Sequence, residues 1–152
     1  LHGRHHRRQR RELREIEMTD PITRAGEMFA RTAANRFLGT RLVSRAPDRV
    51  EVRMNARPEM AQEYGVVQGG ILSGLADTAA VYLLIPDAMD RGRVHGVELK
   101  MNFLRPALAD GSDLVAVAAP VKLGRTIAVC SVDITQGDRH VAQGTFTYLI
   151  DA

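Results

Sequence analysis

The chain has 152 residues, of which 45% are hydrophobic and 26% charged, and this composition predicts one globular domain with room for a core. The formal net charge is +3, but residues 1–17, with six arginines and three glutamates, carry all of it, which argues against a nucleic-acid-binding domain. The single cysteine, Cys130, excludes a disulfide framework and any multi-cysteine metal site.

Residues 1–17 are basic and poor in apolar side chains, so we expect a disordered tail without a function of its own, followed by a single domain over residues 18–152. No apolar run is long enough to cross a membrane, and no signal-peptide core is present. We therefore expect a cytoplasmic protein.

The domain is predicted to begin with a helix and a β-hairpin. A helix start is indicated at Thr19-Asp20-Pro21, where a capping residue precedes proline. Apolar residues then recur at helical spacing up to Gly39, which predicts one helix lying on a sheet. Residues 50–54 alternate between apolar and polar side chains, and the Pro47-Asp48 turn makes residues 40–46 the partner strand.

Residues 64–86, YGVVQGGILSGLADTAAVYLLIP, form the stretch around which the domain is organised. Gly69 and Gly70 precede an apolar run and predict a helix entry, and Pro86 predicts the point where the helix stops. Because apolar residues fall on nearly every face of the run, we expect a buried helix, too short to span a bilayer.

Asp77 is the one carboxylate on this helix. A carboxylate on a buried helix is costly unless it is paired, hydrogen-bonded or used in chemistry. One interpretation is a structural aspartate bonded to Ser73, one turn back, or to a backbone amide. The other is a general base or nucleophile tuned by its buried surroundings.

The N-terminus of the same helix predicts a site for a developing negative charge. The amides of Gly69 and Gly70 lack intrahelical acceptors there, and the helix dipole favours an anion, as in an oxyanion hole. Asp77 lies two turns on, about 10 Å from Gly70 at roughly 1.5 Å per residue. We therefore expect the acid and the amides of one site to come from different subunits.

The C-terminal half predicts strands. Residues 97–103 alternate between apolar and polar side chains, and three further segments, joined by tight turns, predict an antiparallel meander: Ser112–Lys122, Arg125–Thr135 and His140–Ile150. Cys130 falls in this apolar pattern and is expected to be a small buried residue. One long helix with five or six antiparallel strands is an α+β fold of two layers.

Two motifs carry a family resemblance. The segment Gly65-Val66-Val67-Gln68-Gly69-Gly70, followed by Leu75-Ala76-Asp77-Thr78-Ala79, resembles the central-helix motif of hotdog-fold acyl-CoA thioesterases of the PaaI-like group. In that group a His-Gly-Gly precedes an acid that lies nine positions after the histidine, and the spacing from Gln68 to Asp77 is the same. Residues 97–106 resemble the strand that follows the helix, and the likeness spans roughly residues 36–150.

The resemblance implies a hotdog fold, in which an antiparallel sheet wraps one long central helix, and a homodimer that forms a dimer of dimers. It also implies hydrolysis of an aryl- or medium-chain acyl-CoA without a metal or redox cofactor. Asp77 would be the base or nucleophile, and the Gly69 amide, assisted by Gln68, would polarise the carbonyl. Gln62 would orient the acyl group or water. The remaining implied residues are the CoA contacts Gly70, Gly124, Arg125, Thr126 and Arg105, a weaker one at Lys100, and a pocket wall of Leu72, Tyr82 and Phe103.

Gln68 is the main departure from the group, because its amide can donate a hydrogen bond but cannot carry charge or a proton as histidine does. A non-catalytic acyl-CoA-binding hotdog protein is therefore the alternative function, although such a protein has no need of Asp77. A hotdog dehydratase would need a histidine paired with an acid, which this helix lacks. Ser73 does not fit a nucleophile elbow, because the preceding glycine is three rather than two positions away.

Overall fold

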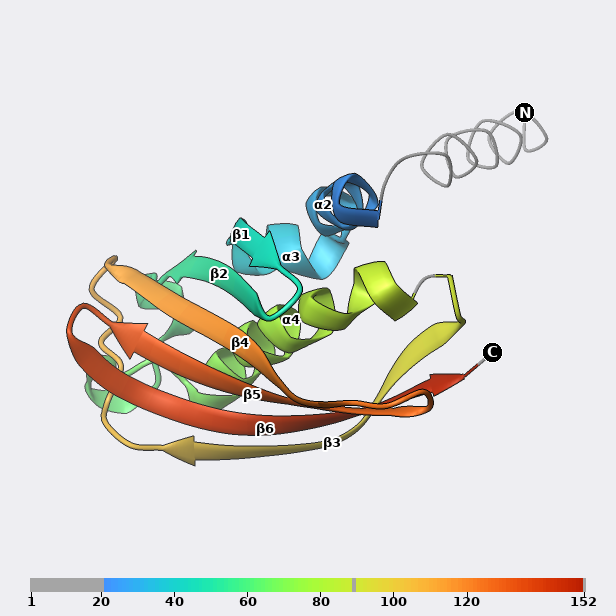
Figure 1. Ribbon diagram of the computed structural model, residues 1–152. Helices are drawn as coiled ribbons and strands as arrows, with labels where there is room; N and C mark the ends of the chain where they lie inside the picture. The colour runs from blue at the N-terminus through green and yellow to red at the C-terminus, as the bar shows by residue number, and fades with distance from the viewer. Residues whose placement is uncertain (1–20, 89, 152) are drawn as a thin grey trace, which may run out of the picture.

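A computed structural model describes residues 21–88 and 90–151 and shows one antiparallel sheet that curves around a long helix (Figure 1). The predicted tail, residues 1–17, lies outside the described residues. The elements in chain order are α2 Pro21–Arg31, α3 Ala33–Leu38, β1 Thr40–Ala46, β2 Arg49–Asn55, the short 3₁₀ turns η1 Pro58–Met60 and η2 Glu63–Gly65, α4 Gly69–Ala88, β3 Arg93–Phe103, β4 Asp113–Leu123, β5 Ile127–Gln136 and β6 Arg139–Asp151. The six strands are in the order β1-β2-β4-β5-β6-β3.

The sheet confirms the predicted α+β hotdog architecture. Strands β4, β5 and β6 form the predicted antiparallel meander, and β3 pairs with the far side of β6. Alternate residues of β4 and β5 face α4 and are fully buried, as the period of two requires. Cys130 is one of them, and burial raises the pKa of its thiol to about 11, so it stays protonated and inert.

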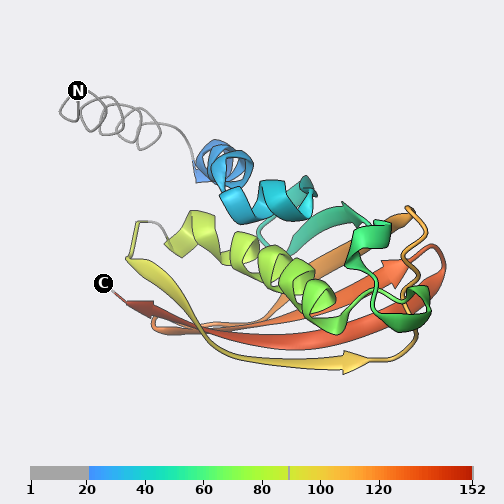
Figure 2. The ribbon, with the colours of Figure 1, turned by 180° about the vertical axis from the view of Figure 1, so that it is seen from behind.

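Helix α4 lies across the concave face of the sheet and buries most of its surface there (Figure 2). The prediction that all of its faces are buried is wrong for this chain, because one stripe stays open. Gly70 and Asp77 are exposed, and Ser73, Val81 and Ile85 are half-buried. These positions recur every three or four residues, which is the spacing of one helix face. The apolar side chains of this open stripe, Val81 and Ile85, are only partly covered by the described residues.

Pro86 does not end the helix, as the sequence predicted, since α4 continues to Ala88. A proline inside a helix removes the N–H that would bond the carbonyl four residues earlier, here that of Tyr82. Arg45, on β1, supplies donors instead: its Nε lies 3.1 Å from the Tyr82 oxygen and its Nη2 lies 3.1 Å from the Leu83 oxygen. A side chain far along the sequence therefore satisfies the carbonyl that proline leaves unpaired.

The first predicted helix is two helices, α2 and α3, divided at Thr32. Thr32 has an extended backbone (ψ 117°), and its hydroxyl donates to the carbonyl of Met28, a bond that competes with helix continuation. Phe29 is buried and packs edge-on against Tyr82 of α4, with ring centroids 4.7 Å apart. Phe37, the last aromatic residue of the predicted helical pattern before Gly39, is 81% exposed and so does not cover the sheet as that pattern predicted.

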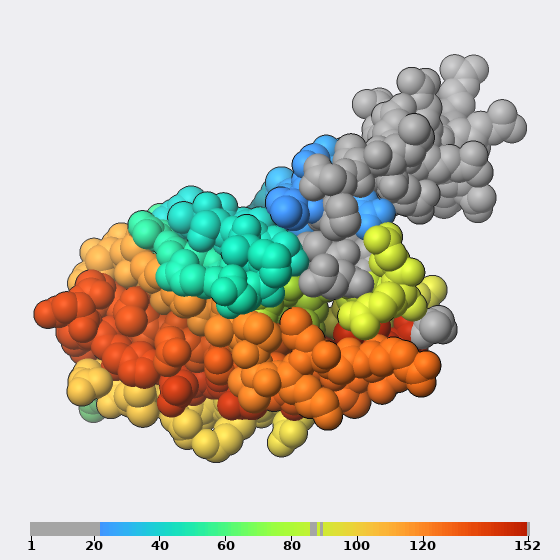
Figure 3. Space-filling view, in the orientation of Figure 1, coloured from blue at the N-terminus to red at the C-terminus, as the bar shows by residue number. Residues whose placement is uncertain are grey.

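Strand β3 forms one edge of the sheet (Figure 3). Its alternation correctly predicted a strand, and its apolar side chains Val97, Leu99 and Phe103 are 53–57% exposed. An edge strand with unpaired backbone groups and exposed apolar side chains is a template for pairing with another chain. No helix within the described ranges is both long enough and apolar enough to cross a membrane.

Candidate active site

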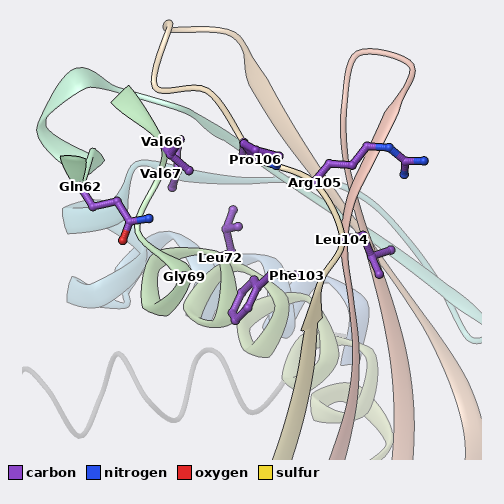
Figure 4. A pocket seen from close by; sticks show the side chains of 10 residues that line it. Gln62, Val66, Val67, Gly69, Leu72, Phe103, Leu104, Arg105 and Pro106 are labelled. Atoms are coloured by element: carbon purple, nitrogen blue, oxygen red, sulfur yellow. The ribbon is translucent and has the colours of Figure 1, made fainter. Parts of the chain in front are cut away.

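A cavity of about 470 Å³ opens at the N-terminus of α4 (Figure 4). Three of the predicted site residues line it: Gln62, Gly69 and Arg105. Gln62 points into the space from the loop before the helix, and Leu72 and Phe103 face it from α4 and β3. Most of the remaining wall is apolar, formed by Val66, Val67, Leu104, Pro106 and Ala107. An apolar cavity with a few polar groups at a helix N-terminus is suited to a small acyl ligand.

Gly69 is the first residue of α4 and lies next to the ring of Phe103. A Cβ at this position would lie 2.9 Å from the ring, so the ring approaches the helix terminus only because residue 69 is glycine. The amides of Gly69 and Gly70 belong to the first turn and have no intrahelical acceptor. They are available to a negatively charged ligand atom.

Gln68, the residue before the helix, folds its side chain over the first turn. Its Oε1 accepts from the backbone amide of Ile71 at 3.1 Å, as a capping oxygen does, and lies close to Gly70. The amide nitrogen, Nε2, remains able to donate. Gln68 therefore secures the helix N-terminus.

The segment that precedes α4 is held by the loop between β3 and β4. Val67 donates its amide to the carbonyl of Ala107 at 2.8 Å, and Val66 forms a β-bridge with Leu108. Leu108 is held in turn by the buried side chain of Gln136 at the end of β5. The backbone amide of Leu108 donates to Gln136 Oε1 at 2.8 Å, and Gln136 Nε2 donates to the backbone carbonyl of Leu108 at 2.7 Å. A chain of hydrogen bonds thus runs from β5 to the helix N-terminus.

We predict that Gln136→Leu lowers the free energy of unfolding by about 1–3 kcal/mol, because both polar backbone groups of Leu108 lose their partner. Denaturant unfolding checks this, with Gln143→Leu, at an exposed position of β6, as the control. Equal stability of the two variants would contradict the role given to Gln136.

Asp77 lies on the open stripe of α4, about 10 Å along the helix from Gly70 at roughly 1.5 Å per residue. Its predicted burial is wrong for this chain, because the residue is exposed. The suggested partner, Ser73, is also wrong: Ser73 Oγ donates to the carbonyl of Gly69 at 3.0 Å. Asp77 Oδ1 instead accepts from the hydroxyl of Tyr148, on β6, at 2.6 Å. Asp77 does not line the cavity at Gly69 of its own chain.

The predicted CoA contacts divide between the two ends of the sheet. Arg125 and Thr126 form the β4–β5 turn and line a second cavity of about 460 Å³ at the end opposite to Gly69 (Figure 1). Gly124 is required in this turn, because a Cβ would lie 2.5 Å from the carbonyl oxygen of Ile127. Arg105 points away from Gly69 and donates from Nη1 to the carbonyl of His140 at 3.0 Å (Figure 4). Lys100 is exposed and donates to Asn102.

Of the predicted pocket wall, the structure places Leu72 and Phe103 at the cavity but not Tyr82. The Tyr82 hydroxyl lies 3.1 Å from Thr32 Oγ1 and 3.4 Å from Asn35 Nδ2, on the side of α4 covered by α2 and α3. Within the described residues, no three histidine, cysteine, aspartate or glutamate side chains come together in a way that could hold a metal ion.

Sequence reasoning missed Tyr148 and Gln136. Both belong to strands in which they read as ordinary members of an alternating pattern. Their partners, Asp77 and Leu108, are 71 and 28 residues away in the sequence, and a local motif does not predict contacts between residues so far apart. One contact joins a strand to the helix α4 and the other joins a strand to a loop, so only the packed structure shows them.

Comparison with known proteins agrees with this architecture. The sequence model of the thioesterase superfamily matches residues 64–143, which is more than half of the chain. Acyl-coenzyme A thioesterase 13 from Homo sapiens is 34% identical over 110 residues, covering 70% of this chain and 76% of that protein.

Solved structures give the same result. A thioesterase family protein from Silicibacter pomeroyi is 31% identical with a TM-score of 0.75, covering 82% of this chain and 93% of that one. The E. coli PaaI protein from the phenylacetic acid degradation operon is 25% identical with a TM-score of 0.76, covering 84% and 91%. These matches confirm the hotdog fold and the resemblance to the PaaI-like group. The chain belongs to the thioesterase superfamily.

Proposed function

We propose that the protein hydrolyses an acyl-CoA thioester to the free acid and coenzyme A. The observation that carries this proposal is the apolar cavity at the open N-terminus of α4, with a carboxylate, Asp77, on the open stripe of the same helix. The first-turn amides can stabilise the oxyanion that forms when a thioester carbonyl is attacked. The carboxylate can activate water or attack the carbonyl itself.

A second copy of the chain would bring these two parts together. Tyr148 pairs with Gly96 in the register of β6 and β3, and it contacts Asp77, so Asp77 lies beside the first half of β3. Phe103 and the cavity lie at the other end of that strand. If β3 pairs with its own copy antiparallel about a two-fold axis near Leu99, Phe103 of each chain approaches Gly96 of the other. The carboxylate of one subunit then reaches the helix N-terminus of its partner.

The exposed surface supports such a dimer. Val97 and Leu99 lie on the unpaired edge, 57% and 53% exposed, and the open stripe of α4 beside it carries Val81 and Ile85. Pairing of the edges satisfies the backbone groups of β3 and covers these apolar side chains. This agrees with the expectation that the site is complete only between two subunits.

In the proposed reaction, Asp77 removes a proton from water as the water oxygen attacks the thioester carbon, or it attacks directly and forms an anhydride that water then cleaves. The Gly69 amide of the partner subunit, assisted by Gln68 Nε2, donates to the carbonyl oxygen as it becomes negative. The C–S bond breaks, and the thiolate of coenzyme A leaves and takes up a proton. Gln62 orients the acyl group or water. The proposed contacts of the pantetheine or phosphates come from both sides of the interface: Gly124, Arg125 and Thr126 of the subunit that supplies Asp77, and Gly70 and Arg105 of the partner subunit.

A non-catalytic acyl-CoA-binding protein is the second candidate. Gln68 favours it, because this side chain cannot carry a proton and its Oε1 already accepts from Ile71. A binder would keep the cavity and have no use for the carboxylate on the open stripe.

The two functions are separated by the release of free thiol from a panel of aryl- and alkyl-CoA thioesters. Saturable turnover with at least one thioester supports the hydrolase and begins to define its acyl group. Saturable binding of the same thioesters without thiol release would establish the binding protein instead.

A further inference from the structure

Tyr148 is a buried tyrosine on the core face of β6, near the end of that strand, and 2% of its surface is exposed. Its neighbours in the register are both small: Gly96 on β3 and Ala128 on β5. A Cβ at residue 96 would lie 3.7 Å from the ring, in ordinary contact, so a longer side chain there would press against it. The small neighbours leave room for the ring to extend across the sheet toward α4.

The hydroxyl of Tyr148 contacts Asp77. It lies 2.6 Å from Oδ1 and 3.3 Å from the main-chain carbonyl oxygen of the same residue, so its single proton is directed mainly at the carboxylate. Burial raises the pKa of Tyr148, and the adjacent carboxylate raises it further. The phenol therefore stays protonated and acts on Asp77 only as a donor.

The hydroxyls of α4 itself do not compete for this role. Ser73 Oγ donates to the carbonyl of Gly69, and Thr78 Oγ1 donates to that of Gly74 at 2.8 Å. Within the described part of the chain, Tyr148 is the side chain that holds the Asp77 carboxylate. The other titratable group close to the phenol is the buried thiol of Cys130, which remains neutral.

We propose that Tyr148 is a positioning residue for the thioesterase reaction. Its hydroxyl fixes Asp77 Oδ1 and so directs Asp77 Oδ2 at the cavity of the partner subunit. This inference rests on the proposed function. The terminal torsion of an aspartate has a broad preference, so an exposed carboxylate without such a donor samples many orientations. A carboxylate held by one oxygen presents the other in a fixed direction, as a base or nucleophile requires. Tyr148 itself touches Asp77 and not the cavity.

Tyr148→Phe tests this with little change in packing, and Tyr82→Phe is the matched control. Both tyrosines are buried, and both lose a hydrogen-bonded hydroxyl, but that of Tyr82 faces Thr32 and Asn35. We expect Tyr148→Phe to lower kcat about tenfold or more, as for loss of a hydrogen bond to a charged group, and to leave KM within about twofold. Tyr82→Phe should keep the wild-type kcat. Equal kcat values for the two variants would overturn the proposal.

The same substitution in an Asp77→Asn background separates positioning from a general effect on folding. If Tyr148 acts through the carboxylate, Tyr148→Phe lowers kcat little further in the Asp77→Asn background. A structural role would lower kcat by the same factor in both backgrounds. A loss of activity in Asp77→Asn with normal activity in Tyr148→Phe refutes only this inference. Wild-type activity of Asp77→Asn refutes the proposed function and this inference together.

A measurement without turnover checks the contact itself. In the wild-type protein the hydroxyl proton of Tyr148 should resonate downfield and exchange slowly with water, and both properties should be lost in Asp77→Ala. A rapidly exchanging hydroxyl in the wild type would overturn the proposal even if the Tyr148→Phe variant did not fold.

Discussion

Asp77→Asn is expected to lower kcat for thioester hydrolysis by about a thousandfold and to leave KM nearly unchanged. Asparagine has the shape of aspartate, and its carbonyl oxygen can still accept from Tyr148, so the fold should persist. What is lost is the ability to take a proton or attack a carbonyl, which the amide lacks at neutral pH. Thiol release at saturating substrate measures the effect directly.

Asp48→Asn is the control for this experiment, because Asp48 is exposed in the turn between β1 and β2, where it has no part in the site. It should behave as the wild type. If Asp77→Asn hydrolysed thioesters at the wild-type rate, the carboxylate would not be the base or nucleophile, and the proposed mechanism would be wrong.

Leu99→Arg is expected to convert the proposed β3-paired dimer to a monomer and to reduce turnover at least a hundredfold. Leu99 is 53% exposed on the edge strand, so arginine is tolerated in a single chain. Near the two-fold axis, however, two arginines would meet and place like charges in an apolar interface, which disfavours pairing. Sedimentation and thiol release on the same samples test whether assembly and activity are lost together.

Val121→Arg provides the matched comparison, because Val121 is 64% exposed on β4, away from the β3 edge. It should remain dimeric and active. A Leu99→Arg monomer with full turnover would show that one chain contains the whole site.

The fold was largely predictable from the sequence because its signals are local. Alternating side chains marked β2 and β3, and tight glycine-containing turns marked the meander of β4, β5 and β6. The errors arose where distant residues act on an element. Pro86 is tolerated inside α4 because Arg45 bonds the carbonyl of Tyr82, and no pattern near Pro86 reveals that donor.

The site was predictable in part. The glycines at the helix start and the isolated acid two turns later identified Gly69 and Asp77, and the structure places them on a cavity and on an open stripe. The expectation that Asp77 is buried failed because hydrophobicity alone cannot distinguish a helix covered by its own chain from one left open to a second chain. Tyr148 and Gln136 became visible only in the packed structure, because Tyr148 reaches from the sheet to α4 and Gln136 reaches from β5 to the loop between β3 and β4.

The most direct test of the central claim, that a carboxylate of one subunit acts with a helix N-terminus of the other, is thiol release by hybrid dimers. One subunit carries Asp77→Asn and the other Gly69→Pro, which removes the proposed oxyanion donor; proline suits the backbone at the start of a helix, although the Phe103 ring, 2.9 Å from a Cβ here, has to shift in that subunit. Each variant alone should be nearly inactive. A mixture refolded at equal amounts should recover about a quarter of the wild-type rate, since half of the dimers are hybrids with one intact site each. No recovery, with hybrids demonstrably formed, would contradict a site shared between two subunits.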